Sequence, residues 1–477
     1  MDENPTSKSI SDQKDIDRSY HFPTLFLVTK AAGWLLLSTL FSLVASIKMH
    51  SPTFLSNCPW VTYGVLVPAS QNAFLYGFAL QAGFAAMLWM TMRLGQVKLR
   101  GPGFLFLGTV LWNIALLVGI LGLMGGGQSG YAFLSMPGFV YPMLFTAYVL
   151  IGGMTLLTFF KRQAREIYPS QWFIYASLYW FPWMLTAASY ALFASEPARG
   201  VAQAVIHGWY ASGMTTIVLG FVGIALLQYL VPKLTRRDLH NSNLSAFAFW
   251  VLLLFGGFTG LLQAQALPAW VGTLSSVCNA FVAFAWIVLT ANLWKTLQGA
   301  GKQNSDPLAF NLVRLAALCG LLGALLNFWG SRPGTAETVQ FTLYVQGVYW
   351  LQLFGFVGTL LLVAAYHFLP RVSDQESVLS GPFGWKSIMM LYATGSILVG
   401  LVYVLGGWKQ GKALADASRS FLEVQSAAMS FIRISTIGEL LVFLAAAVLA
   451  VNMTRSLVAY LVGYIKCCCN CKNESAQ

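Results

Sequence analysis

The chain has 477 residues, of which 57% are hydrophobic and only 9% are charged, and its formal net charge is +12. Soluble domains carry about 25% charged residues, so this composition excludes a soluble globular protein and indicates an integral membrane protein whose first partner is the lipid bilayer. The positive charge does not imply a nucleic-acid partner. The basic residues lie in short loops between apolar stretches, where membrane proteins concentrate them.

The chain begins with a polar segment, residues 1–23, that mixes acidic and basic side chains. This segment lacks the basic-then-apolar pattern of a cleaved signal peptide, so we expect the first apolar run to be an uncleaved membrane anchor. We predict one membrane domain over residues 24–465, followed by a cysteine-containing cytoplasmic tail over residues 466–477. No stretch outside the apolar runs is long enough to form another domain.

Apolar runs separated by turn and charge signals predict twelve membrane spans. Each run is long and continuously apolar, unlike the alternating ten-residue strands of a membrane barrel, so the predicted fold is an all-α polytopic bundle. Frequent Gly and Ala within the runs favour close contact between helices in lipid. The predicted spans cover residues 24–48, 68–94, 103–125, 138–160, 171–194, 205–231, 245–266, 270–294, 308–329, 340–369, 386–406 and 426–455.

Basic residues are distributed unequally between the two sides of this bundle. The side with more of them carries Arg93, Lys98, Arg100, Lys161, Arg162, Arg165, Lys233, Arg236, Arg237, Lys295, Lys302, Arg371 and Lys386. The loops of the other side carry only Lys48, Arg199, Arg332, Lys409, Lys412 and Arg419. Because cytoplasmic loops of membrane proteins are enriched in Lys and Arg, this bias predicts that both termini are cytoplasmic.

Histidine is scarce, and the chain has only five. His207, at the start of the apolar stretch 206–233, is the only one that could lie deep in a span. A histidine at a span entrance is more often a packing residue than a ligand, so we do not assign His207 to a metal. No two histidines stand two or four residues apart, and methionines on apolar helices are usually packing residues. The inventory predicts no metal site.

Few ionisable residues lie within the predicted spans, which makes each a functional candidate. Glu439 is the deepest acid and the best candidate for a proton-carrying group. Arg433, in the same span, is expected to be a structural tie; the alternatives are pairing with a carboxylate on a neighbour or with a propionate if a cofactor is present. Buried amides are expected mainly to join helices by hydrogen bonds, with a polar cavity as the alternative. They include Gln71, Asn72, Gln81, Asn113, Gln228, Gln263, Gln265, Gln346, Gln352 and Asn452.

The cysteines give no disulfide framework, because Cys58, Cys278 and Cys319 are scattered. The other four crowd the tail, at Cys467, Cys468, Cys469 and Cys471. Zinc sites prefer two Cys-x-x-Cys pairs, which this tail lacks, and cysteines close to a membrane can be acylated. We therefore expect an unstructured reduced tail first, lipidation second and metal binding third.

Several stretches, in order, resemble the large subunit of the heme-copper oxidase superfamily, in particular subunit I of the cbb3-type cytochrome c oxidases. These stretches are residues 63–74, 209–233, 266–270 and 341–371, together with Arg433 and Asn452 of the last span. The resemblance covers most of the chain. It implies a twelve-span bundle with cytoplasmic ends in a bacterial inner membrane, which carries two hemes and one copper for cytochrome c oxidase activity.

The ligand histidines of that family are not present at the matching positions. Ser70 stands at the second-span heme ligand, and Ser212 stands at the sixth-span copper ligand. The remaining ligand positions, the paired copper histidines of the seventh span and the His-x-His of the tenth, are taken by Gly260, Leu261, Val348 and Trp350. No tyrosine lies in residues 252–262 to take the cross-linked role. We predict no cofactor, and we expect aromatic side chains such as Trp350 and Phe354 to fill the vacated space.

The sequence favours a ligand-depleted relative of the oxidase large subunit, not catalytic by itself, with a structural or regulatory role in a respiratory electron-transport complex. Its expected partners are other membrane subunits, including a c-type cytochrome subunit as a candidate. A proton or small-solute transporter that uses Glu439 and the buried amides is the alternative from another class. A working oxidase or nitric oxide reductase subunit with unorthodox ligands such as methionine is the third hypothesis.

Overall fold

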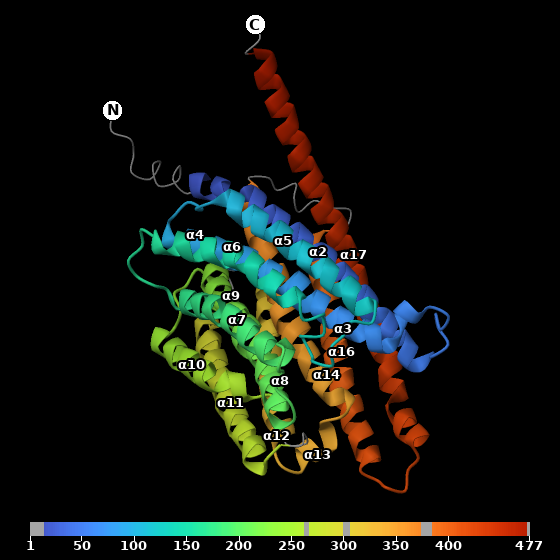
Figure 1. Ribbon diagram of the computed structural model, residues 1–477. Coiled ribbons are helices and arrows are strands. Elements are labelled where there is room, and N and C mark those ends of the chain that lie inside the picture. The colour runs from blue at the N-terminus through green and yellow to red at the C-terminus, as the bar shows by residue number, and fades with distance from the viewer. Residues whose placement is uncertain (1–13, 262–266, 299–305, 374–383, 475–477) are drawn as a thin grey trace.

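The computed structural model describes residues 14–261, 267–298, 306–373 and 384–474, with side chains up to residue 465. The described residues form a bundle of long helices (Figure 1). The first half of the bundle comprises α2 (His21–His50), α3 (Tyr63–Asn72), α4 (Leu80–Gly95), α5 (Pro102–Met124), α6 (Val140–Phe160), α7 (Pro169–Phe193), α8 (Val201–Gly213) and α9 (Gly220–Thr235). The second half comprises α10 (Ser242–Phe255), α11 (Ala269–Leu297), α12 (Pro307–Ser331), α13 (Thr335–Val339), α14 (Leu343–Tyr349), α15 (Thr359–Ser373), α16 (Trp385–Leu414) and α17 (Phe421–Glu474).

The prediction of an all-α polytopic membrane protein is confirmed. Each of the twelve predicted spans lies on one of these helices or helix pairs, and ten helices in the described chain are long and apolar enough to cross a bilayer. The other two are α7, whose tyrosines and tryptophans lower its hydropathy, and α10, which has only 14 residues. The span predicted to end at residue 266 is interrupted earlier, because the helix gives way to a 3-10 turn at Gly256–Phe258.

Three helix pairs form the inside of the bundle. The pairs α3–α4, α8–α9 and α14–α15 are each joined by a π-helical segment into one continuous rod. Their most apolar windows are 100%, 94% and 89% buried, whereas no other candidate span exceeds 56%. The remaining long helices surround these rods and face outward. Side chains at the centre of the bundle therefore come mainly from the second, sixth and tenth predicted spans.

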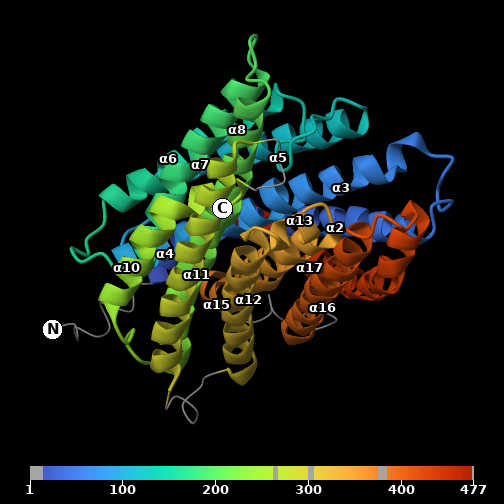
Figure 2. The same cartoon turned by 90° about the horizontal axis from the view of Figure 1, so that it is seen from below.

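Helices that follow each other along the chain mostly lie side by side, and the last helix returns to the first. Seen from below in Figure 2, the colours pass around the bundle until α17 meets α2. The first and last described residues lie at the same end of the bundle (Figure 1). This end is called the terminal end below.

The polar N-terminal segment is partly folded onto the bundle. Residues 14–19 are helical, and Tyr20 is completely buried. The Tyr20 hydroxyl donates to Asp17 Oδ1 at 2.8 Å, and Asp17 Oδ2 forms an ion pair with Arg93 Nη2 of α4 at 3.1 Å. The first membrane helix accordingly begins at His21, slightly before the predicted start at residue 24.

The prediction of an unstructured cysteine tail is wrong for its backbone. The structure continues α17 to Glu474, well beyond the predicted span end at residue 455, and the helix projects past the rest of the bundle (Figure 1). The physical reason is the lack of a stop signal, because residues 456–474 contain no proline and only one glycine, Gly463. The side chains of the four tail cysteines lie outside the described residues.

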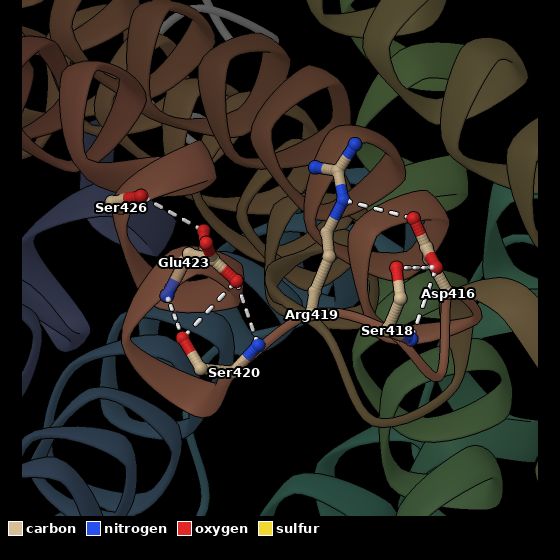
Figure 3. Close-up of polar contacts among 6 residues, drawn as sticks. All are labelled: Asp416, Ser418, Arg419, Ser420, Glu423 and Ser426. Carbon is tan, nitrogen blue, oxygen red and sulfur yellow. Dashed lines mark hydrogen bonds and ion pairs between the residues drawn. The ribbon is translucent and has the colours of Figure 1, made fainter.

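The loop that joins α16 to α17 is held by its own side chains (Figure 3). Asp416 Oδ1 accepts hydrogen bonds from the Ser418 hydroxyl and backbone N–H at 2.6 and 3.1 Å, and Oδ2 accepts from Arg419 Nε at 3.1 Å. These bonds hold the pKa of Asp416 below its ordinary value. Ser420 and Glu423 form a reciprocal capping box, which sets the start of α17.

Asp306 fastens the terminal end of three helices. Its Oδ1 accepts from the backbone N–H groups of Leu308 and Ala309 at 3.0 and 3.3 Å, so it caps α12. Its Oδ2 accepts from the Tyr366 hydroxyl of α15 at 2.7 Å and lies 3.6 Å from Lys386 Nζ of α16. Burial raises the pKa of Asp306, but these hydrogen bonds and the lysine charge outweigh it and hold the pKa below its ordinary value.

We expect Asp306→Ala to lower the free energy of unfolding by about 1 kcal/mol, the usual cost of a lost helix cap. Asp306→Asn keeps an acceptor for the cap and should cost less. Because the folded-state pKa is depressed, the stability contributed by the charge is present above the unfolded pKa and lost as pH falls below about 4. Thermal unfolding in detergent at pH 7 and pH 3.5 measures both effects. An equal loss of stability for Asp306→Ala at the two pH values would contradict the charge contribution.

Candidate functional site

Two cavities lie on either side of the central rod that runs from α14 to α15. The first encloses about 680 Å³ between α2, α3, α16, α17 and the π-helical segment Trp350–Gly358. The second encloses about 560 Å³ between α8, the segment 259–260, α12 and α14. Both volumes include space that is open to the outside of the bundle. Tyr349 lines both cavities and separates them.

The first cavity includes two of the substituted ligand positions, Ser70 and Trp350. Ser70 Oγ donates to the Ser38 carbonyl at 2.9 Å, and Ser38 Oγ donates to the Ser70 carbonyl at 2.9 Å. This reciprocal pair joins α2 to α3 directly. The Ser70 hydroxyl is therefore committed to a contact between helices.

Aromatic rings fill one side of the first cavity. The ring of Phe354 stacks on Trp350 at 3.9 Å between centroids and on Phe74 at 3.8 Å, with interplanar angles of 20° and 23°. All three residues are buried. The expectation that Trp350 and Phe354 occupy interior space agrees with this stack. Val348 lies elsewhere, in a small cluster with Val339 and Tyr344.

At the second cavity, the substituted positions Ser212 and Gly260 contact the backbone of neighbouring segments. Ser212 Oγ donates to the carbonyls of Gly257 at 2.7 Å and Gly208 at 2.9 Å. A Cβ added at Gly260 would lie 2.7 Å from the Gly208 carbonyl oxygen and 2.9 Å from Ser212 Cβ. Leu261 packs beside this contact, buried to 3% exposure. The helix α8 thus packs so closely on residues 256–261 that a larger side chain at Gly260 cannot be accommodated.

Each inner rod carries its π-helical segment next to a substituted ligand position. The segment Ala73–Ala79 begins three residues after Ser70, and Met214–Leu219 begins two residues after Ser212. The third segment begins at Trp350 itself. Such segments are rare and are frequently found at functional sites. They were not predicted, because hydropathy and turn signals do not distinguish π from α backbone.

His207 has a structural role. Its Nε2 accepts a hydrogen bond from the backbone N–H of Ala132 at 2.9 Å, and Gln203 Nε2, one turn earlier on α8, donates to the Tyr131 hydroxyl at 2.6 Å. Together they hold residues 129–136, which enter the bundle and place the buried Phe133 in the wall of the first cavity. The packing role expected for a histidine at a span entrance agrees with these contacts.

We expect His207→Ala to destabilise the protein by about 1 kcal/mol, because the partly buried Ala132 N–H loses its acceptor. The matched control is His240→Ala, since His240 is exposed and its loss should leave the melting temperature unchanged. Thermal unfolding of both variants in detergent checks the prediction. Equal melting temperatures for His207→Ala and the wild type would show that the hydrogen bond contributes nothing.

Glu439 lies in the wall of the first cavity, 2% exposed. Its Oε2 accepts from the Ser42 hydroxyl of α2 at 2.7 Å, and its Oε1 accepts from the Tyr403 hydroxyl of α16 at 2.9 Å. Ser46, one turn after Ser42, bonds to the Thr436 hydroxyl at 2.7 Å. Sequence reasoning identified Glu439 but missed its partners, although the hydroxyls four residues apart on α2 are a signal for a polar helix face.

The other candidates are more dispersed. Arg433 is exposed on α17, so it does not enter either cavity, and Asn452 is buried on the same helix. Gln263 and Gln265 lie outside the described residues. Among the described residues, no three His, Cys, Asp or Glu side chains gather in a way that could hold a metal ion.

Comparison with known proteins establishes the family. The family model for cytochrome c and quinol oxidase polypeptide I matches residues 23–441. The chain belongs to this family. The predicted resemblance to the oxidase large subunit is thereby confirmed, and the chain is a multi-pass membrane protein with bacterial relatives.

Relatives of the oxidase polypeptide I family match nearly end to end. The chain is 28% identical to the cbb3-type cytochrome c oxidase subunit CcoN1 of Stutzerimonas stutzeri, over 84% of this chain and 87% of the relative. It is 23% identical to a cytochrome c oxidase subunit 1 homolog of Azorhizobium caulinodans, over 89% and 79% of the two chains. It is also 23% identical to a bacteroid homolog from Bradyrhizobium diazoefficiens, over 90% and 81%.

The residues present at the substituted positions do not fit the hemes and copper that the oxidase polypeptide I family implies. Heme iron and copper are held in proteins by imidazole, thiolate, thioether or phenolate ligands, none of which serine, glycine, leucine, valine or tryptophan supplies. The Ser70 hydroxyl is bonded to Ser38, and the contact between Gly208 and Gly260 leaves no room for an imidazole. No reaction step through these groups is derived for this chain.

Proposed function

We propose that this chain is a ligand-depleted member of the oxidase polypeptide I family, a pseudo-enzyme with a structural or regulatory role in a respiratory membrane complex. The main support is that residues at the family's heme and copper ligand positions pack helices together. Ser70 closes α2 onto α3, and Gly260 closes residues 256–261 onto α8. A bundle whose ligand positions hold helices together retains the architecture of the family without its redox chemistry.

The expected location is a bacterial membrane, and the expected partners are other membrane proteins. The bacterial relatives favour a bacterial inner membrane, and the loop charges favour cytoplasmic positions for both termini. The names of the relatives describe oxidase subunits, so other membrane subunits of a respiratory complex are the expected partners, with a c-type cytochrome subunit as one candidate. Arg433, exposed on α17, offers a charged contact for such a neighbour.

Heme and copper content test this proposal. The chain, purified with a tag from its native membrane, is assayed for heme by pyridine hemochrome spectra and for copper by mass spectrometry. A relative that retains its histidines, purified in parallel, is the positive control. We expect far less than one heme and one copper per chain. Stoichiometric heme would overturn the proposal and favour an oxidase or nitric oxide reductase subunit with unorthodox ligation.

A second candidate function is a proton or small-solute pathway, favoured by Glu439 and its hydroxyl partners in the first cavity. Intramembrane carboxylates often mark such pathways. Proton and solute flux into proteoliposomes, compared between the wild type and Glu439→Gln, tests this function. Flux that is absent, or unchanged in the variant, removes this candidate.

A further inference from the structure

The first cavity has a single buried acid and no basic side chain in its wall. Its lining residues come from α2, α3, α14, α16, α17, the π-helical segments Ala73–Ala79 and Trp350–Gly358, and the loop that carries Phe133; among these described residues, Glu439 is the only charged one. Two of its lining residues lie near the surface, at the end of α2 and the start of α3: Tyr63 is 38% exposed and Met49 is partly exposed.

The basic residues closest to Glu439 and Ser42 along α17 and α2 do not pair with the Glu439 carboxylate. Arg433 precedes it by six residues on α17, about 120° around the helix axis, and is exposed. Lys48, six residues after Ser42 on α2, donates to the Phe54 carbonyl at 2.6 Å. A carboxylate inside a membrane bundle must either hold a proton or meet a cation, because an uncompensated buried charge is very costly.

The rest of the cavity is suited to a cation with an apolar body. Aromatic side chains form much of the wall: Tyr63, Phe74, Phe133, Tyr349, Trp350, Phe354 and Tyr403. Ring faces attract organic cations within about 6 Å, and aromatic cages are a recurrent means of holding quaternary ammonium groups. A hard metal ion instead needs six or more oxygen ligands around it. Here the two oxygens of Glu439 already accept hydrogen bonds from Ser42 and Tyr403.

We propose that the first cavity binds an organic cation, an ammonium or related group carried on an apolar body, which pairs with Glu439 and lies against the aromatic wall. Ser42 and Tyr403 hold the carboxylate in position by donating to its two oxygens. The polar amides Gln71 and Gln346 contact the polar part of the ligand. This assignment does not depend on the proposed subunit role, and heme analysis does not decide it.

The test uses the full chain purified in detergent and radiolabelled tetraphenylphosphonium as the probe, measured by equilibrium dialysis. Triphenylphosphine oxide, a neutral molecule with similar rings, is the ligand control. We expect saturable binding of one cation per chain. The neutral compound should bind at least roughly tenfold more weakly than the cation, which corresponds to about 1.4 kcal/mol for one ion pair. Equal affinity of the wild-type protein for the two compounds would overturn the proposal.

Glu439→Gln keeps the shape of the side chain and removes the charge. We expect it to weaken tetraphenylphosphonium binding by roughly tenfold or more. Glu423→Gln is the matched control, because Glu423 lies on the same helix but outside the cavity and should leave binding unchanged. Size-exclusion profiles confirm that both variants are folded. Wild-type affinity in Glu439→Gln would show that the probe binds only by its apolar surface.

Discussion

Replacing Gly407 with valine is expected to prevent the bundle from assembling. A Cβ at Gly407 would lie 1.9 Å from the Tyr344 backbone nitrogen and 2.6 Å from its Cα, so it would meet backbone that cannot rotate away. Gly347 meets α16 in the same manner, with its Cβ position 2.5 Å from the Val404 nitrogen. Small residues permit such close helix contacts in membranes. Overpacking costs about 1–3 kcal/mol when side chains can adjust, and we expect more here.

The yield of monodisperse protein after solubilisation and the melting temperature in detergent measure this effect. Gly33→Val is the matched control, because Gly33 also lies within a long helix but has no atom within 4 Å of its Cβ position. We expect the control to behave as the wild type and Gly407→Val to aggregate or to melt many degrees lower. A Gly407→Val protein with a normal yield and melting temperature would show that α14 and α16 are not packed this closely.

Phe354→Ala is expected to destabilise the protein by about 3–5 kcal/mol, the usual cost of removing a buried aromatic ring. The ring of Phe354 stacks between those of Trp350 and Phe74, so its loss leaves one face of each neighbouring ring without a stacking partner. The new space would join the existing cavity of about 680 Å³. Loss of this ring therefore removes packing at the centre of the bundle.

Unfolding of purified protein by denaturant in mixed micelles measures the change. Phe421→Ala is the control, because Phe421 is 76% exposed at the start of α17 and its loss should change the free energy of unfolding little. Phe354→Leu keeps part of the volume and should lie between the two. A loss below about 1 kcal/mol for Phe354→Ala would mean that the stack does not support the bundle.

The sequence predicted the position and order of the long apolar helices, because a long apolar run is a local property that each span carries by itself. Ten of the twelve predicted spans lie on helices of the described chain that are long and apolar enough to cross a bilayer. The bonds that define the cavities are not local. Glu439 was recognised as the deepest acid, but its partners Ser42 and Tyr403 lie 397 and 36 residues away, on helices whose packing no single span reveals. His207 similarly meets Ala132 across 75 residues.

Helix ends and backbone irregularities were predicted less well than helix existence. The break at Gly256–Phe258 and the continuation of α17 to Glu474 depend on capping and on the absence of stop signals, which hydropathy does not report. The substituted positions Ser70, Ser212 and Gly260 were found by order and spacing along the chain. Their contacts with Ser38, Gly257 and Gly208 came only from the packing of the helices.

Because α17 is one uninterrupted helix, a small tilt near Glu439 would displace its C-terminal end by several ångströms. From Glu439 to Glu474 it spans 35 residues, or roughly 50 Å at 1.5 Å per residue. A tilt of about 5° at Glu439 would move the far end by about 4 Å, which distance measurements between spin labels can resolve. Any event that shifts this acid would thus be amplified at the membrane surface, where a neighbouring subunit could sense it.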